Sequence, residues 1–209
     1  MNKRQHGAYN KREVASAPLT MEDFNRLING LHADEDYQWE AYCVISFVTA
    51  LRVSDVLGLK WCDVVNQKSL SFVEQKTRKS RTIPFDTSVR NKINKLWKLN
   101  GKPDLDLPIM LNNSAYNRTG EVAPYSMQYI NRKLKNFKHK YRLEIPINQF
   151  SSHTFRKTFG RYVYDSNNQS FEALNLLNMI FGHSNIKTTQ IYLGIQSEEI
   201  ENIYKTIKF

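Results

Sequence analysis

Apolar residues recur at helical spacing through most of the chain, and this pattern is interrupted once by a segment of strand character. Ser69–Val73 and Arg81–Phe85 carry β-branched and aromatic residues and flank a polar connection, Glu74–Ser80. Residues three and four apart lie on one face of a helix, so the rest of the pattern requires helices with a buried side. The chain is therefore expected to be mainly α, an α+β fold with one small antiparallel β-hairpin.

Capping residues and apolar spacing place the expected helices. Thr20 marks the start of the first, because its hydroxyl can accept a hydrogen bond from the opening N–H groups and acids follow it. The segment 103–124, rich in Asp, Pro and Asn, is expected to be a loop. Further helices are expected at about residues 37–51, 54–59, 87–99, 126–141, 154–165, 171–181 and 198–207. Residues 19–209 are expected to form one domain after a basic flexible arm, residues 1–18, which can equally be a disordered leader or a linker.

The chain is strongly basic, with 30 Lys and Arg against 20 Asp and Glu and a net charge of +10. This excess favours a polyanionic partner, either nucleic acid or an acidic membrane surface. No apolar run is long enough for a membrane span, and the first residues lack the apolar stretch of a signal peptide. Cys43 and Cys62 lie in apolar surroundings without metal-ligand spacing, which favours two reduced core residues and a cytoplasmic location.

The segment Gly182–Leu193 is the most distinctive motif of the chain. Tyr192, one of eleven tyrosines, follows the pair Gly182-His183 at a fixed interval, with two threonines between. The segment can be only a loop and a helix start, or it can place a phenol nucleophile beside an imidazole. The choice depends on whether other parts of the chain supply the charges that such a nucleophile needs.

Three other places carry charge that a core rarely accepts. Arg52 ends an apolar run and needs an anion, which Asp55 can supply as an ordinary salt bridge on one helix face. His153 and Arg156 share a face at a helix start, where N–H groups favour an anion, although a lone His there is usually a cap or core residue. The hairpin connection is either a solvated charge run or a site for phosphate contacts, and its cations are Lys76, Arg78, Lys79 and Arg81.

Together these groups can break a phosphodiester bond. Guanidiniums bind the charged non-bridging oxygens in a bidentate manner, and histidines hydrogen-bond to them or shuttle protons. A lysine in a cationic setting can protonate the departing alkoxide. The chain has no cluster of residues at metal-ligand spacing, so neither a metal nor another cofactor is expected.

With these residues the chain resembles the tyrosine recombinase, or phage integrase, family over about residues 19–207. The matching motifs occur in the family's order, as Ala50-Leu51-Arg52-x-Ser54-Asp55, Lys76 on the hairpin, His153-x-x-Arg156, Gly182-His183 and Tyr192. The resemblance implies the family's catalytic-domain fold and a site-specific DNA recombinase. Tyr192 would attack a scissile phosphate, form a 3′-phosphotyrosyl link and release a 5′-hydroxyl, in the integration, excision or inversion of DNA.

The resemblance also implies a role for each matching residue. Lys76 would be the general acid; Lys79 competes for this role, and counting back from Ile83-Pro84 favours Lys76. Asp55 would support Arg52 without contacting the reacting phosphate itself. The groups that would stabilise the phosphorane are Arg52, His153, Arg156 and His183. The expected contacts to double-stranded DNA are Arg78, Lys79, Arg81 and Lys157.

Further expectations concern assembly, and two other functions stay open. The resemblance implies a homotetramer on two DNA sites that is monomeric without DNA, and it implies accessory DNA-bending proteins as partners. It also implies association with the nucleoid and an origin in a bacterium, a phage or another mobile element. The apolar stripe of the helix at 198–207 can dock on its own subunit or be exchanged between protomers. The family's usual amino-terminal clamp domain has no counterpart in residues 1–18, so the chain is either a minimal recombinase or a catalytic portion. The alternative functions are a type IB-like topoisomerase and a catalytically silent DNA-binding regulator.

Overall fold

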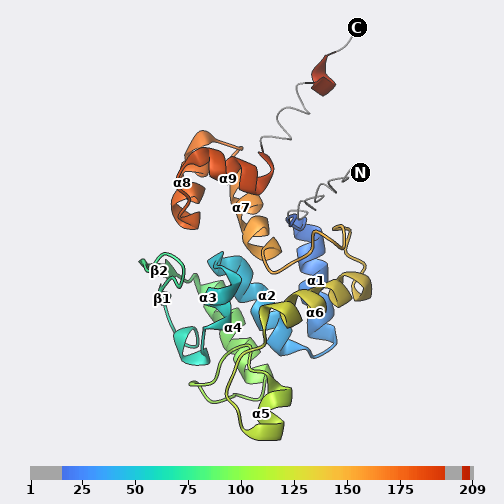
Figure 1. The fold of residues 1–209 in the computed structure, drawn as a ribbon, viewed down its shortest axis with the longest axis vertical. Helices are drawn as coiled ribbons and strands as arrows, with labels where there is room; N and C mark the ends of the chain where they lie inside the picture. The colour runs from blue at the N-terminus through green and yellow to red at the C-terminus, as the bar shows by residue number, and fades with distance from the viewer. Residues whose placement is uncertain (1–15, 196–203, 208–209) are drawn as a thin grey trace, which may run out of the picture.

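The structure is a computed structural model and describes residues 16–195 and 204–207 (Figure 1). This part of the chain is mainly helical with a single two-stranded hairpin, which confirms the predicted mainly helical class. The elements in order are α1 (Met21–Ala33), α2 (Tyr37–Thr49), α3 (Val53–Leu57), the 3-10 helix η1 (Trp61–Asp63), β1 (Ser69–Val73), β2 (Ser80–Pro84), α4 (Thr87–Leu99), α5 (Asn113–Thr119), α6 (Met127–Lys140), α7 (Thr154–Ser166), α8 (Phe171–Phe181) and α9 (Ile186–Leu193). Over the described ranges, no helix combines the length and the apolar character needed to cross a membrane.

The hairpin is a two-stranded antiparallel sheet whose register runs from Ser69 opposite Pro84 to Val73 opposite Ser80. Leu70 on β1 is buried in the core, and its partner Ile83 packs against the same core. One face of the hairpin is therefore anchored on the helices beside α3 and α4, and the connection between its strands extends from the molecule (Figure 1).

Helix α2 lies at the centre of the larger core and packs against α1, α4 and α7 (Figure 1). Apolar side chains surround it on all sides, as expected of a helix in the interior of a domain. Its one buried acid, Glu40, is fully enclosed and pairs with Lys92 of α4 and, at 2.8 Å, with His32 of α1. The buried carboxylate thus has the cationic partner that burial requires.

Helix α7 joins this core to a second, smaller cluster formed with α8 and α9. Phe155, near its start, belongs to the larger core, whereas Tyr164, near its end, packs in the smaller one. Phe181 and Leu193 bring α8 and α9 into that smaller cluster. The packing of α9 in the smaller cluster therefore requires α9 to approach α7 closely.

Gly160 allows this close approach, and we expect Gly160→Ala to destabilise the fold. A Cβ at this position would lie 2.6 Å from Leu193 Cδ2 and 2.8 Å from Phe181 Cζ. Overpacking typically costs about 1–3 kcal/mol, which outweighs the gain of about 1 kcal/mol from the better helix propensity of alanine. Urea unfolding should show a lower free energy of unfolding for this variant. Gly58→Ala is the control, since its nearest contact is the end of the flexible Gln75 side chain at 3.3 Å; equal effects would refute the steric explanation.

Most predicted helices are present, with shifts of a few residues at their ends. Thr20 caps α1 as predicted, its side chain accepting from Asp23 N. The helix predicted at 37–51 ends at Thr49, because Ala50 adopts a left-handed conformation with φ 50° and Arg52 is extended. Strand β2 begins and ends one residue earlier than predicted. Both cysteines are free, Cys43 buried and Cys62 partly exposed.

One prediction was wrong and another lies outside the described residues. The segment 103–124, predicted to be a loop, contains α5. Its signals were present in the sequence, because Asn112 caps the helix by accepting from Ala115 N and Gly120 ends it in a left-handed conformation. The helix predicted at about 198–207 falls mostly on residues 196–203, which are outside the described part of the chain, as is most of the arm at residues 1–18.

Candidate active site

Tyr192 lies on α9, in the smaller cluster, with its hydroxyl buried near the Arg156 guanidinium and in no well-formed hydrogen bond with the residues that the structure describes. Its ring packs edge-on against the rings of Phe181 and His183, with centroids 5.4 and 5.3 Å away. Burial raises the pKa of the phenol to about 12, although the charges of Arg156 and Arg52 act in the opposite direction. The phenol is thus held neutral, close to two guanidiniums that favour its anionic form.

Those two guanidiniums converge on one carbonyl. Arg156, only 3% exposed, donates to the Phe181 carbonyl at 2.8 Å and also to the Ala50 carbonyl. Arg52 donates to the same Phe181 carbonyl at 3.3 Å. Phe181 is the last residue of α8, where unpaired carbonyls carry the negative end of the helix dipole. Backbone carbonyls therefore position both arginines, and burial together with the neighbouring cations lowers the pKa of Arg156 to about 10.

The anion that pairs with Arg52 is Glu74, at the end of β1, and not Asp55. Glu74 is 2% exposed and accepts from Arg52 at 2.9 Å, from Arg81 at 2.8 Å and from the Thr77 hydroxyl at 2.5 Å. Burial alone would raise the pKa of this carboxyl, but the three donors hold it at about 2. The hairpin is therefore tied to Arg52 by a buried charge pair.

The predicted Arg52–Asp55 pair was wrong for a geometric reason. Arg52 is the extended residue before α3, so its side chain does not share a helix face with Asp55. Asp55 is buried and instead accepts from the backbone N–H of Gln75 at 2.9 Å. It therefore holds the backbone next to Glu74, the residue that pairs with Arg52.

We expect Glu74→Gln to lower the free energy of unfolding at pH 7 by about 1–3 kcal/mol, because two guanidiniums lose a buried anionic partner. A carboxyl whose folded pKa lies at about 2, below its usual 4.5, contributes stability above pH 4.5 that is lost as the pH falls towards 2. The difference between variant and wild type should therefore shrink over that range in urea unfolding. Glu121→Gln, at an exposed acid, should have little effect at any pH. A pH-independent difference for Glu74→Gln would contradict the ion-pair explanation.

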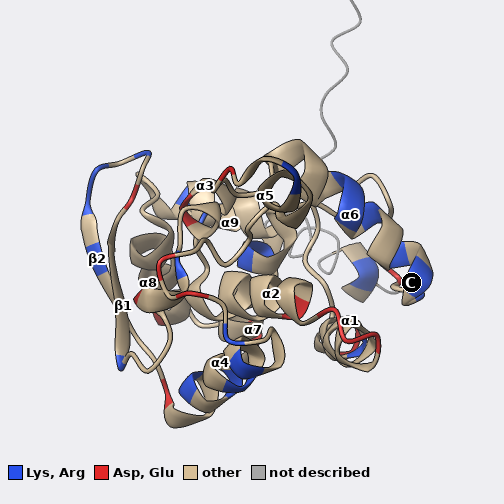
Figure 2. Ribbon diagram, turned by 90° about the horizontal axis from the view of Figure 1, so that it is seen from below, with Lys and Arg blue, Asp and Glu red and all other residues tan. Residues whose placement is uncertain are grey.

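The cations of the hairpin connection are mostly exposed. Lys76, Arg78 and Lys79 extend into solvent, whereas Arg81 is held by Glu74. Figure 2 shows this basic connection next to β2, with further groups of Lys and Arg on α4 and α6. Within the described residues Lys76 makes no hydrogen bond or ion pair, so its ammonium is free to reach a ligand. Lys79 is also exposed, so the exposure of the two lysines does not identify which one is the general acid.

The two remaining predicted histidines border the arginines. His153 precedes α7 and stays exposed, and partial burial with the charges of Arg156, Lys157 and Arg52 lowers its pKa. His183 is half-buried, and burial followed by the charges of Arg156 and Arg52 lowers its pKa to about 4. Both rings are therefore neutral near pH 7 in the free chain.

Lys157 is buried beside Tyr192, unlike the exposed Arg78 and Lys79 of the hairpin connection. It is 7% exposed, and its ammonium sits 4.9 Å from the centroid of the Tyr192 ring. Burial lowers its pKa. In the free chain this ammonium therefore packs on the ring of Tyr192, and the expected contact of Lys157 with DNA stays a prediction.

Two further residues surround His183 that the sequence did not single out for a role. His183 Nδ1 lies 2.9 Å from the hydroxyl of Thr189, which donates to Asn178 Oδ1 at 2.9 Å. Asn178 Nδ2 in turn donates to the His183 carbonyl at 3.3 Å. Thr189 was visible as one of the two threonines before Tyr192, but no local pattern indicated Asn178.

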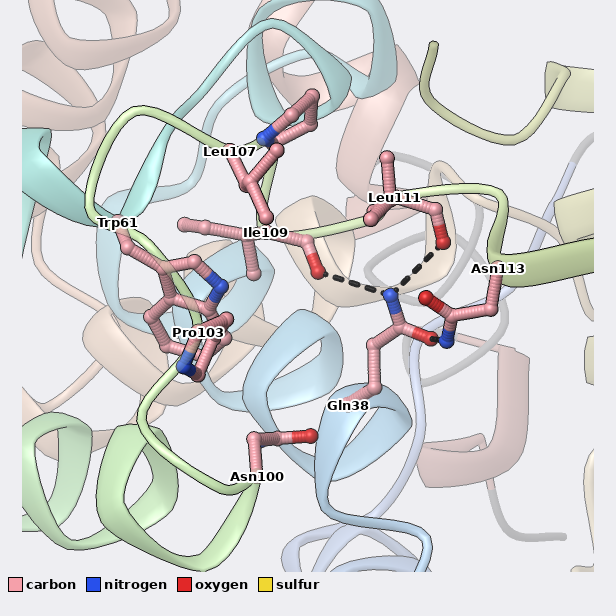
Figure 3. Close-up of a pocket in the computed structure, with 9 residues that line it drawn as sticks. Gln38, Trp61, Asn100, Pro103, Leu107, Ile109, Leu111 and Asn113 are labelled. Carbon is pink, nitrogen blue, oxygen red and sulfur yellow. Dashed lines mark hydrogen bonds between the residues drawn. The ribbon is translucent and has the colours of Figure 1, made fainter. Parts of the chain in front are cut away.

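A small cleft between α2, α4 and the segment after α4 lies apart from these groups (Figure 3). Gln38 Nε2 donates to the Ile109 and Leu111 carbonyls at 3.1 and 3.0 Å, and Asn113 donates to Gln38 Oε1. Its lining has no charged side chain, and these bonds hold the segment in place, so its role is structural. Across the described residues, no three His, Cys, Asp or Glu side chains are grouped so as to hold a metal ion.

The sequence is similar to known integrases and recombinases. The model of the phage integrase family matches residues 18–199. The probable integrase/recombinase YoeC of Bacillus subtilis (strain 168) is 31% identical over 157 residues, which cover 75% of this chain and 77% of that protein. Tyrosine recombinase XerC of Halalkalibacterium halodurans is 24% identical over 198 residues, covering 90% of this chain and 61% of that protein. The chain thus spans about three fifths of the length of the XerC and XerD relatives from that organism.

Solved structures share the fold. The crystal structure of XerA recombinase superposes with a TM-score of 0.66 at 18% identity, covering 94% of this chain and 67% of that one. A lambda integrase dimer bound to a COC′ core site gives a TM-score of 0.61 at 17% identity, covering 88% and 49%. The helices and the hairpin are therefore arranged as in these proteins.

Proposed function

The chain belongs to the phage integrase family, and from this membership and the geometry of the site we propose that it is a tyrosine-type site-specific recombinase. It cleaves and rejoins DNA strands through a 3′-phosphotyrosyl intermediate. The observation that carries the proposal is the convergence of Arg52 and Arg156 beside the phenol of Tyr192. Two guanidiniums next to a buried nucleophile are the groups that attack on a phosphodiester requires.

Each step of the reaction then has a group to carry it. The Tyr192 oxygen forms a bond to phosphorus, and the bond from phosphorus to the 5′-oxygen breaks. Arg52 and Arg156 bind the non-bridging oxygens, whose charge increases in the transition state, together with His153. Lys76 gives a proton to the departing 5′-oxygen. A 5′-hydroxyl from a second strand later attacks the link, so the energy of the bond is retained and neither ATP nor a metal is required.

A DNA phosphate would bind beside the arginine contacts seen in the free chain. In the free chain the Phe181 carbonyl accepts from both guanidiniums, and Glu74 accepts from Arg52. Each guanidinium has five N–H donors, so a phosphate can add to these contacts and need not displace them all. The exposed cations of the hairpin connection would approach the phosphates on either side of the scissile one.

The proposed assembly rests on family membership. The lambda integrase neighbour is a dimer bound to a core site, and XerH is described with a palindromic difH substrate. For this chain we propose a homotetramer on two double-stranded DNA sites, formed from monomers, with accessory DNA-bending proteins and association with the nucleoid. The +10 charge supports a DNA partner.

The proposal is tested with a nicked duplex that carries the junction sequence flanking the gene in its host. We expect a protein–DNA adduct that survives denaturation and is linked to the 3′ side of the break. A second, unlabelled duplex should then receive the labelled strand. Relaxation of supercoiled DNA without strand exchange would identify a topoisomerase, and binding without any adduct would identify a silent regulator.

A further inference from the structure

The hydrogen bonds behind His183 determine which of its ring nitrogens carries the proton. Asn178 and His183 are joined through the backbone as well as through side chains, since His183 N donates to the Asn178 carbonyl at 3.1 Å. The Asn178 side chain then bonds to the His183 carbonyl at 3.3 Å. A carbonyl only accepts, so the Asn178 atom that faces it must be the NH₂ group. The amide orientation of Asn178 is therefore determined, and its Oδ1 faces Thr189.

The Thr189 hydroxyl has a single proton, and this proton is donated to Asn178. Asn178 Oδ1 is only an acceptor, so it receives the proton in a hydrogen bond of 2.9 Å. Thr189 Oγ1 then has only lone pairs left for His183 Nδ1, which lies 2.9 Å away. Nδ1 must therefore be the protonated nitrogen. Thr189 is completely buried, so water does not compete for its hydroxyl.

We propose that Thr189 and Asn178 are positioning residues that hold neutral His183 as its Nδ1–H tautomer and leave Nε2 free to accept the proton of the Tyr192 phenol. The second part rests on the proposed function. The rings of His183 and Tyr192 are direct neighbours, with centroids 5.3 Å apart. In the free chain the Tyr192 hydroxyl makes no hydrogen bond to any described residue, His183 included, so the transfer requires the phenol oxygen to approach Nε2 when the scissile phosphate binds.

The proton transfer completes the balance of the cleavage step, in which the bond from phosphorus to the 5′-oxygen breaks and Lys76 protonates that oxygen. The phenol O–H bond breaks as the oxygen–phosphorus bond forms, and the proton moves to His183 Nε2. The imidazolium so formed can donate to a non-bridging oxygen, which gains charge at the same moment. Burial and the two arginines keep the ring unprotonated beforehand, with a pKa of about 4. The negative charge that develops on the phosphorane favours the imidazolium, so the pKa of His183 rises as the transfer proceeds. His183 thus begins as an acceptor and becomes a donor during the reaction.

The tautomer is measured without any DNA. In the full 209-residue chain labelled with ¹⁵N-histidine, the protonated and unprotonated ring nitrogens of a neutral imidazole are clearly separated in chemical shift. The His183 signals are assigned with His183→Gln. We expect Nδ1 to be protonated in the wild type. An Nε2-protonated ring in the wild type would overturn the proposal.

Three variants test the assigned partners. Thr189→Ser keeps the hydroxyl and should keep the Nδ1–H tautomer. Thr189→Val, of nearly the same shape, should lose it, and Asn178→Ala should also lose it because the Thr189 proton is released towards Nδ1. Thr188→Val is the control, since Thr188 is exposed and bonds to Asn185 instead. Retention of the Nδ1–H tautomer in Thr189→Val would also overturn the proposal; if that variant does not fold, the wild-type spectrum and Asn178→Ala decide.

Adduct formation provides the second measurement. Partners that orient a metal-binding histidine typically account for about 10- to 100-fold in activity, and we expect a similar factor for a histidine that transfers a proton. Thr189→Val and Asn178→Ala should slow adduct formation on the nicked duplex by about that factor, with Thr189→Ser close to wild type. A changed tautomer with an unchanged rate would overturn the role of Nε2. If the wild type has the Nδ1–H tautomer but forms no adduct, the tautomer assignment stands and the proposed function fails.

Discussion

Tyr192→Phe should form no covalent adduct with the nicked duplex, while it folds at least as well as the wild type. Removing the nucleophile of a covalent mechanism lowers the rate by at least about 10⁴-fold, which places the adduct below detection. The fold should not suffer, because the hydroxyl is buried and forms no well-formed hydrogen bond within residues 16–195 and 204–207. A buried, unpaired polar group costs about 1–3 kcal/mol, so the free energy of unfolding should rise slightly.

The distinguishing result is that Tyr192→Phe loses adduct formation while its free energy of unfolding rises slightly. The adduct is measured by denaturing gel electrophoresis, and stability by urea unfolding of the free protein. Tyr162→Phe is the matched control, at an exposed tyrosine on α7, and should keep full activity. An adduct that persists in Tyr192→Phe would assign the nucleophile to another residue.

Lys76→Ala should slow cleavage of ordinary DNA by about 10²- to 10⁴-fold, the usual contribution of a general acid. The reason is that a 5′-alkoxide is a poor leaving group unless it is protonated as the bond breaks. A 5′-thiolate leaves without protonation, so a substrate with sulfur at the bridging 5′ position should restore most of the lost rate. Single-turnover cleavage of the two substrates, compared between wild type and variant, measures this recovery.

Lys79→Ala is the necessary comparison, because both lysines are exposed on the same connection. If Lys76 is the acid, Lys79→Ala should slow both substrates to the same, smaller extent, as the loss of a phosphate contact does. Equal losses on both substrates for Lys76→Ala would assign it to phosphate binding. Recovery by sulfur only in Lys79→Ala would transfer the acid role to Lys79.

Several features were predictable because they depend on neighbouring residues. The start of α1 at Thr20, the ends of α4 and α8, and the mainly helical class follow from caps and apolar spacing within a few residues. Helix α5 was missed although Asn112 and Gly120 carried its cap signals, because apolar spacing is weak in a helix with no buried residue. The end of α2 was placed too late because Ala50 gives no local sign of its left-handed conformation.

The contacts of the candidate site were not predictable in this way. Arg52 meets Glu74 across 22 positions and the Phe181 carbonyl across 129, and Arg156 meets the Ala50 carbonyl across 106. A charged residue in sequence shows only that a partner is needed. Which partner it finds depends on how the hairpin and α8 pack on the turn between α2 and α3.

The order and types of the reactive residues are properties of the sequence alone, since covalent spacing sets Arg156 one helical turn after His153 and Tyr192 on the helix after Gly182-His183. Tertiary structure decided the rest. It made Glu74 rather than Asp55 the anion for Arg52, buried Lys157 against Tyr192, and placed Asn178 behind His183. The physical reason is that hydrogen bonds and ion pairs form over about 3 Å, a distance that is determined by the packing of whole elements and not by residues adjacent in the chain.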